Sequence, residues 1–275
     1  MYNRVISHYI SNKIITNNQF GFRKKSSTDK AAYKLINNIL TALNNKRIVG
    51  SIFFDLEKNF DCVNHDILLA KMEYYGVRGV MHTLIKSYLE NRYQRVKFNN
   101  KLSKWNKINI GVPQGSVLGP LLFLIYINDL PSVMPCTLSN DNSSSILFAG
   151  DTSVIISDPC FMNFERNLNI VFKTMMKGFN SNLLLLKFDK TYYKLFITKT
   201  KFLNKINIEH ENEMVIQTNF VKFLGITVDN TLSWKQNIAT ITPKLNKASY
   251  IIRRSRLYLT QVALKMVYYA FFFTQ

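Results

Sequence analysis

The chain has 275 residues, 47% of them hydrophobic, which is enough to bury a sizeable core in one large domain or two small ones. Lys and Arg number 36 against 17 Asp and Glu, and this net charge of +19 indicates a polyanionic partner rather than a basic surface without a ligand. The 3 cysteines lack CxxC spacing and no apolar stretch is long enough to cross a bilayer, which argues against a disulfide scaffold, a zinc knuckle and a membrane protein.

The first part of the chain combines helices with a basic loop. Residues 1–18 are polar and predict a helix, and residues 29–45 show a helical period with one buried face. Between them, the segment Asn18–Thr28 is turn-like and ends in hydroxyl residues that can cap the next helix. Arg23 and Lys24 in this loop can clamp phosphates, or they can simply be solvated.

A strand predicted over residues 48–54 delivers Asp55 at its C-terminal end. The chain then turns and brings Phe60 near the same place. A helix follows over residues 64–75, with an asparagine as its N-cap and a glycine just beyond its end. A second helix is expected over residues 80–91.

Basic, strand-like segments follow at residues 93–98 and 105–110. The Gly-rich loop Gly111–Pro120 comes next, and such a loop lets the backbone approach a ligand closely. Gln114 is its polar side chain best placed to touch a nucleotide, although turn chemistry alone would also explain the loop. The apolar run 121–127 is too short for a membrane helix and predicts a buried core helix.

The segment 145–156 contains two apolar runs around an Ala-Gly-Asp-Thr corner. This pattern predicts a β-hairpin with a glycine-assisted turn. Asp151 would then lie at the hairpin tip, where it is well placed to meet Asp55. The alternative is an ordinary hairpin with a polar turn.

The last third of the chain alternates short strands and helices. The expected elements are a helix (164–179), a basic turn (188–191), a strand (192–198), two short strands (199–220), a strand that reaches a turn (222–229) and a helix from residue 235 onward. The sequence stops in the apolar run Tyr268–Phe273, and we therefore expect a truncated fold.

Five motifs occur in a fixed order along the chain: Asn18–Thr28, Asp55–Leu68, Gly111–Phe123, Leu147–Thr152 and Lys222–Trp234. Together they resemble the reverse transcriptase domain of non-LTR retrotransposons, close to the jockey-like elements of insects. The resemblance covers nearly the whole chain and implies an α+β, right-hand polymerase fold. It implies partial fingers in residues 1–48, an antiparallel-sheet palm with an inserted fingers segment in 49–200, and the end of the palm with a partial thumb in 201–275.

The resemblance also implies a reaction. An RNA-directed DNA polymerase of this kind extends a DNA primer on an RNA template with dNTPs, using two Mg2+ ions that stabilise the attacking and leaving oxygens. Asp55 and Asp151 match catalytic metal ligands of the family. We would expect such a protein in the nucleus or in a cytoplasmic ribonucleoprotein.

Further residues match nucleotide-binding and primer-binding positions of the family. Phe60 matches the residue that screens out a ribose 2′-hydroxyl, and Lys190 fits a basic turn near the triphosphate. The full set of expected nucleotide-binding residues is Arg23, Lys24, Phe60, Gln114, Gly115 and Lys190. The expected primer grip is Phe223, Leu224 and Gly225.

The chain departs from the family pattern at two positions near the expected metals. Where the family has Phe-Ala-Asp-Asp, this sequence has Gly150 before Asp151, so the first carboxylate of the pair is missing. Asn59 stands where a small residue usually precedes Phe60. We therefore expect a degenerate copy with impaired polymerase activity. The alternatives are a catalytically inert nucleic-acid-binding remnant of a retrotransposon and a basic α/β protein unrelated to polymerases.

Overall fold

The structure is a computed structural model that describes residues 1–134, 143–196, 206, 208–210 and 213–272. The contacts between residues divide the chain into two compact units, Met1–Thr218 and Asn219–Gln275.

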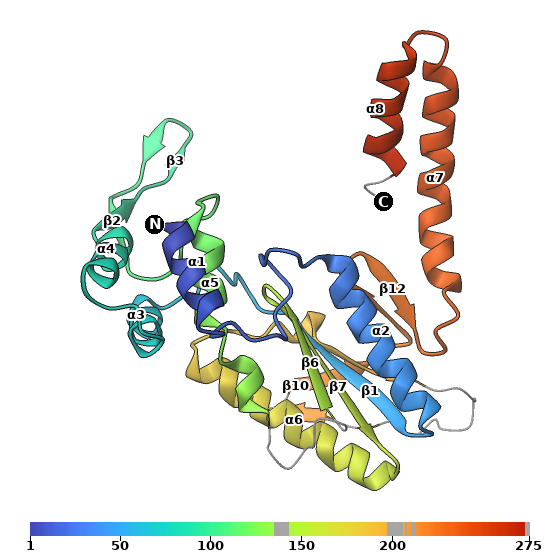
Figure 1. Cartoon of the computed structure of the whole chain (residues 1–275), viewed down its shortest axis with the longest axis horizontal. Helices are drawn as coiled ribbons and strands as arrows, with labels where there is room; N and C mark the ends of the chain where they lie inside the picture. Colours follow the sequence, from blue (N-terminus) through green and yellow to red (C-terminus); the bar gives the residue numbers. More distant parts are fainter. Residues whose placement is uncertain (135–142, 197–205, 207, 211–212, 273–275) are drawn as a thin grey trace. The chain divides into compact units, whose positions relative to one another are not determined.

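A six-stranded sheet forms the centre of the first unit (Figure 1). Its strands, in spatial order, are β6 (Ser143–Phe148), β7 (Asp151–Asp158), β1 (Ile48–Phe54), β8 (Tyr192–Phe196), β10 (Glu213–Gln217) and β9 (Ile208–His210). All neighbouring pairs are antiparallel except β8 and β10, which are parallel. The mostly antiparallel sheet and the predicted bounds of β1 are confirmed.

Two helices cover opposite faces of this sheet, α2 (Thr28–Asn44) and α6 (Phe161–Ser181). Side chains alternate along a strand, so neighbouring residues of β7 point to different faces. Val154 and Ile156 belong to the main core together with residues of α6, whereas Ile155 lines a groove beside α2. Both helices lie close to their predicted ranges, and Ser27 caps α2 by accepting a hydrogen bond from the Lys30 amide.

The remaining α-helices of this unit pack on one another, two short 3-10 turns contact α6 and β10, and two short strand pairs complete the unit. The helices are α1 (Tyr2–Ser11), α3 (His65–Tyr74), α4 (Gly79–Leu89), α5 (Leu118–Tyr126) and the 3-10 turns η1 (Leu130–Val133) and η2 (Phe188–Lys190). The strand pairs are β2 (Arg92–Gln94) with β5 (Asn106–Ile108) and β3 (Lys97–Phe98) with β4 (Lys101–Leu102). Helix α1 is shorter than the prediction of residues 1–18, because Lys13, the residue after its C-cap Asn12, adopts a positive φ of 53°.

Local sequence signals act as expected in this region. Asn64 caps α3 by accepting a hydrogen bond of 3.0 Å from the Ile67 amide, and Gly76 follows the helix with a φ of +86°. From Leu121 to Tyr126, α5 is buried throughout, as its apolar sequence predicted. Within the described ranges, no helix is long and apolar enough to cross a membrane.

The second unit contains β11 (Phe220–Phe223), β12 (Ile226–Asp229), α7 (Lys235–Ser255) and α8 (Gln261–Phe272). The prediction of one strand over residues 222–229 is wrong, because the segment folds back on itself as an antiparallel hairpin. Leu224 and Gly225 form the turn with φ values of 47° and 93°, a left-handed conformation that glycine adopts without a steric cost.

Candidate active site

Asp55 and Asp151 lie opposite each other at one end of the central sheet. Phe54 of β1 pairs with Thr152 of β7, so the next residue of β1 faces the preceding residue of β7. Partial burial and the neighbouring Asp55 carboxylate raise the pKa of Asp151 above its ordinary value. Two carboxylates in this arrangement repel each other, and a bound cation would relieve that repulsion.

The hairpin tip that carries Asp151 has the predicted form but not the predicted turn residue. Phe148 pairs with Asp151, which leaves Ala149 and Gly150 as the two-residue turn. Ala149 adopts the left-handed conformation, with a φ of 53°, whereas Gly150 is not among the residues with positive φ. The expectation of a glycine-assisted turn is therefore wrong, and the backbone does not demand glycine at position 150.

The reason that Gly150 fits is the side chain of Asn59. A Cβ atom placed on Gly150 would overlap the Asn59 amide nitrogen and would lie 2.5 Å from its Cγ. The Asn59 Oδ1 atom lies 3.2 Å from the same point and is buried with no hydrogen-bond partner among the residues that the structure describes. The two departures from the family pattern, far apart in sequence, therefore meet in one place.

Residues 18–21 brace the hairpin tip from outside the sheet. The Phe20 amide donates to the Leu147 carbonyl over 2.7 Å, and the Leu147 amide donates to the Asn18 carbonyl over 2.8 Å. The buried Gln19 side chain accepts hydrogen bonds from the amides of Gly21 (2.8 Å) and Ala149 (3.0 Å). No local sequence pattern singles out Gln19, because its two partners are far apart in the chain.

Arg23 also takes part in this bracing. Its Nη1 donates to the carbonyls of Thr16 (2.7 Å) and Gln19 (3.0 Å), and partial burial lowers its pKa. At least one end of the guanidinium therefore holds the loop together, a structural use that the sequence interpretation did not include. Lys24, the next residue, is exposed.

Phe60 and Gln114 lie on two neighbouring loops. The Phe60 ring is half-buried and contacts Phe123 of α5, with ring centroids 4.8 Å apart, and Phe22, at 6.1 Å. The Val112 amide donates to the Phe60 carbonyl over 2.8 Å, which ties the two loops together. Gln114 donates to the Asp61 carboxylate over 2.8 Å, and Gly115 has a φ of +80°.

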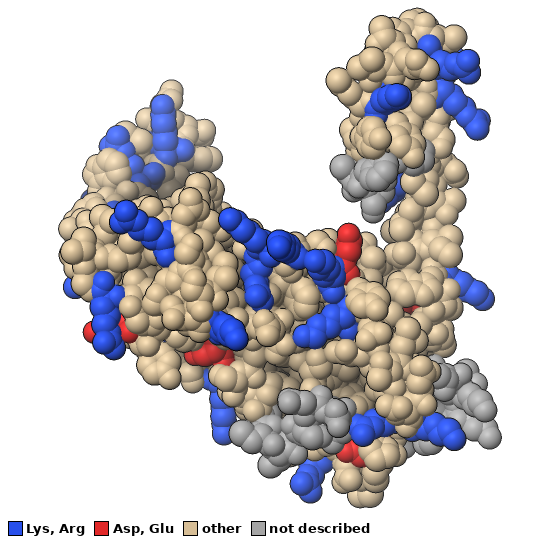
Figure 2. Space-filling model, in the orientation of Figure 1, with Lys and Arg blue, Asp and Glu red and all other residues tan. Residues whose placement is uncertain are grey.

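A groove of about 620 Å3 lies beside Gln114. Among the described residues that line it, Lys58, Arg92 and Lys107 are cationic and Asp61 is the single carboxylate. Lys and Arg are spread widely over the face shown in Figure 2, with few Asp or Glu between them. This groove, which we call the basic groove, offers positive charge and backbone groups to an anionic ligand.

The other predicted site residues lie at element ends. Lys190 is exposed at the end of η2, directly before β8. The predicted primer grip, Phe223 to Gly225, forms the end of β11 and the turn of the second unit's hairpin, not a continuous strand. Its role remains a prediction.

The residues present do not fit the pair of magnesium ions that the resemblance implies. In the described part of the chain, no three His, Cys, Asp or Glu side chains come together to form a metal site. Asp55 and Asp151 supply two carboxylates, and the place of a third is filled by the Asn59 carboxamide. Each divalent ion needs several oxygen ligands, so this donor set is incomplete.

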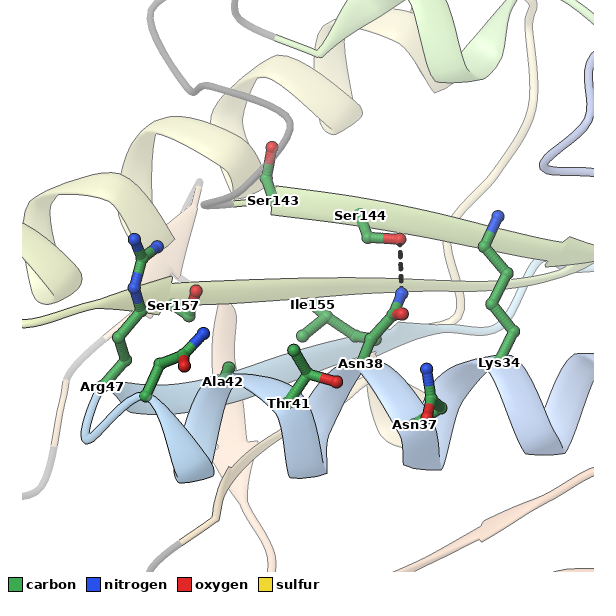
Figure 3. A pocket seen from close by; sticks show the side chains of 11 residues that line it. Lys34, Asn37, Asn38, Thr41, Ala42, Arg47, Ser143, Ser144, Ile155 and Ser157 are labelled. Atoms are coloured by element: carbon green, nitrogen blue, oxygen red, sulfur yellow. Dashed lines mark hydrogen bonds between the residues drawn. The ribbon is translucent and has the colours of Figure 1, made fainter.

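A second polar groove, of about 610 Å3, lies between α2 and the strands β6 and β7 (Figure 3). Asn38 donates to Ser144 across it over 2.9 Å, and Lys34 and Arg47 also line it. Lys34 donates to Asn18 over 3.1 Å and contacts the Phe20 ring, so it supports the loop that braces the hairpin tip. Partial burial lowers the pKa of Lys34.

Comparison with known proteins agrees with this architecture. Residues 1–228 match the family described as reverse transcriptase (RNA-dependent DNA polymerase). The chain is 31% identical over 247 residues to the probable RNA-directed DNA polymerase from transposon BS of Drosophila melanogaster. The matched region covers 87% of this chain and 26% of that protein. It is 27% identical over 240 residues to the RNA-directed DNA polymerase from mobile element jockey of the same species. This match also covers 87% of this chain and 26% of the relative.

Solved structures share the fold. Telomerase of Candida tropicalis, in its apo form truncated from the C-terminal domain, superposes with a TM-score of 0.55 at 14% identity, over 84% of this chain and 43% of that one. Telomerase of Candida albicans in complex with a fragment of telomeric RNA superposes with a TM-score of 0.56 at 14% identity. This superposition covers 84% of this chain and 37% of the telomerase chain. The architecture is a right-hand polymerase fold. The chain belongs to the reverse transcriptase family and is related to the jockey-type mobile elements, although it spans about a quarter of the length of these curated relatives.

Proposed function

We propose that this chain is the reverse transcriptase domain of a non-LTR mobile element in which nucleotidyl transfer is strongly impaired. One observation carries the proposal: Asp55 and Asp151 face each other across β1 and β7, while the neighbouring hairpin position, where the family has a carboxylate, is Gly150. The family fold and two acidic residues are retained, and the remaining acidic ligand is missing.

The partners follow from the same family membership. An RNA template, a DNA primer and dNTPs are the substrates of RNA-directed DNA synthesis, and Mg2+ is the metal that this chemistry uses. The net charge of +19 and the basic groove support binding to phosphates. Phe60, half-buried between two aromatic rings, has little freedom to move, which suits a residue that limits the size of the sugar.

The size of the impairment can be estimated. A thousandfold loss of rate corresponds to about 4 kcal/mol of lost transition-state stabilisation. Removal of an acidic ligand that should neutralise a divalent ion is a change of this order. The alternative function, a catalytically inert nucleic-acid-binding remnant, is favoured by the same glycine and differs only in the absence of any residual synthesis.

Primer extension on an RNA template with Mg2+ and dNTPs tests the proposal. The 275-residue chain should bind the primer–template duplex and extend it weakly, and Asp55→Asn should reduce this extension to background without changing binding. Equal background activity of both proteins, with binding intact, would favour the inert remnant. Rapid extension that Asp55→Asn abolishes would contradict the impairment, and failure to bind the duplex would contradict both the proposed function and its alternative.

A further inference from the structure

Asn59 and Gly150 contact each other so closely that neither position can be considered alone. The Asn59 carboxamide occupies the volume in which any side chain at position 150 would begin. Because the positive φ of the turn belongs to Ala149, the backbone at position 150 could accept an L-residue. The glycine is therefore required by the Asn59 side chain and not by the turn.

The loop that carries Asn59 is fixed on both sides of that residue. Before it, the Asp55 carbonyl accepts a hydrogen bond from the Lys187 amide, and the Glu57 amide donates to the Leu185 carbonyl, both over 2.8 Å. After it, the Phe60 carbonyl accepts from the Val112 amide over 2.8 Å. A backbone held at both ends gives the Asn59 side chain little room to move away from the hairpin tip.

The Asn59 side chain is also poorly matched to its surroundings. Within the described part of the chain, its buried Oδ1 atom has no hydrogen-bond partner, and a buried carbonyl oxygen in this state carries a desolvation cost. It lies beside the tip that carries Asp151 and in the loop that begins at Asp55. A neutral amide in this position fills space but supplies no negative charge to offset a divalent cation.

We propose that Asn59 and Gly150 form one coupled obstacle that keeps divalent cations out of the Asp55–Asp151 site. This inference rests on the proposed function for its biological meaning, but its physical content is a steric one. Gly150→Asp alone would introduce a carboxylate into occupied space. Asn59→Ala alone would open the space without supplying a ligand. Restored binding of Mg2+ requires both changes.

The overlap between the Asn59 side chain and a side chain at position 150 can be tested without introducing a carboxylate. Gly150→Ala adds only the overlapping Cβ, and it should lower the Tm in the Asn59 background but have little effect in the Asn59→Ala background. Asn109→Ala is the matched control for an asparagine truncation in a neighbouring loop, and it should not rescue Gly150→Ala. Equal Tm effects of Gly150→Ala in the two backgrounds would overturn the inference, because the Asn59 side chain would then simply move aside.

The proposed exclusion of cations is tested with Mg2+ itself. Binding of Mg2+ is measured by calorimetric titration and by the change in Tm on addition of the metal. The Asn59→Ala/Gly150→Asp chain should bind Mg2+ at least tenfold more tightly than the natural chain and than Gly150→Asp alone, with a rise in Tm on addition of the metal. Equally tight binding by Gly150→Asp alone would overturn the inference. If the double variant binds Mg2+ without extending a primer, the coupled obstacle is supported and the proposed polymerase function fails, so the two failures are distinguishable.

Discussion

The Gln19 side-chain oxygen accepts two backbone hydrogen bonds, from Gly21 in its own loop at 2.8 Å and from Ala149 at the hairpin tip at 3.0 Å. One buried side chain thus joins segments that are 130 residues apart in sequence. It satisfies the amide of the residue that adopts the strained left-handed conformation of the turn. The geometry at Asp151 therefore depends on a residue that carries no charge.

Gln19→Leu should destabilise the first unit by about 1 to 3 kcal/mol, because it removes the acceptor of the buried Gly21 amide and of the partly buried Ala149 amide. Denaturant unfolding measures the loss, and hydrogen exchange at the Ala149 amide localises it. Gln94→Leu, at an exposed position of β2, is the control and should change stability little. Unchanged exchange at Ala149 in the Gln19 variant would show that other contacts hold the tip.

Lys71 should be among the most sensitive charged positions for stability. Its Nζ donates to the Tyr126 carbonyl (2.5 Å), the Asp129 carboxylate (2.6 Å) and the Asn182 side chain (2.5 Å). Because its side chain is only 16% exposed, Lys71→Met should cost about 2 to 4 kcal/mol by leaving these oxygens unpaired.

Lys86→Met provides the matched control for that prediction. Lys86 pairs with Glu90 one helical turn away, over 3.7 Å, and its side chain is 51% exposed. The control should therefore cost less than about 0.5 kcal/mol. Similar unfolding midpoints for the two variants in urea would show that the Lys71 network contributes little.

RNA binding should weaken steeply as salt increases, because phosphate contacts release counterions. Lys58→Ala and Lys107→Ala, in the basic groove, should each reduce the slope of log K against log salt by about 0.7 for a single-stranded ligand. Lys173→Ala, at an exposed position of α6 that does not line this groove, should leave the slope unchanged. Fluorescence anisotropy at several salt concentrations gives the slopes, and equal slopes in all proteins would place the phosphates elsewhere.

The start of α7 should be sensitive to acid through Asp229. Burial is the largest single contribution and opposes ionisation, but the hydrogen bonds from Ser233 and Thr231 together outweigh it and lower the pKa of Asp229 to about 2. A carboxylate whose pKa is lower in the folded state stabilises that state above its ordinary pKa. This contribution should be complete above a pH of about 4 and should be lost as the pH falls through about 2.

Amide chemical shifts of Thr231 and Ser233, followed by NMR as the pH is lowered, measure that transition. Their midpoint should lie near the pKa of Asp229, about 2. Asp229→Asn removes the titrating group and should abolish the transition. A midpoint near that of an ordinary aspartate would mean that these hydrogen bonds do not favour the charged form.

Much of the fold could be predicted from local patterns. Helical periodicity located α2 and α6, and the strand that ends before Asp55 has its predicted bounds, because these elements are set by neighbouring residues in the chain. The errors lie where one or two backbone angles decide the outcome. Leu224 and Gly225 turn an expected strand into a hairpin, and Ala149 rather than Gly150 provides the left-handed residue of the turn.

The candidate site, like the fold, could be predicted only in part from the sequence. The prediction that Asp55 and Asp151 would meet came from the strand and hairpin patterns together with the order of the motifs along the chain. The overlap of Asn59 with position 150 was not predictable, because it depends on where two distant loops are held in space. The roles of Lys190 and of the predicted primer grip stay predictions.

The hydrogen bonds at Leu147 have a consequence for how the molecule avoids self-association. Strand β6 is the outer strand of the sheet, and such strands readily accept another strand from a second molecule. Here the amide and carbonyl of Leu147 are already bonded to Asn18 and Phe20. The loop thus covers the sheet edge next to the hairpin tip and leaves the amide and carbonyl of Leu147 occupied, so that they do not offer a strand of a second molecule a place to pair.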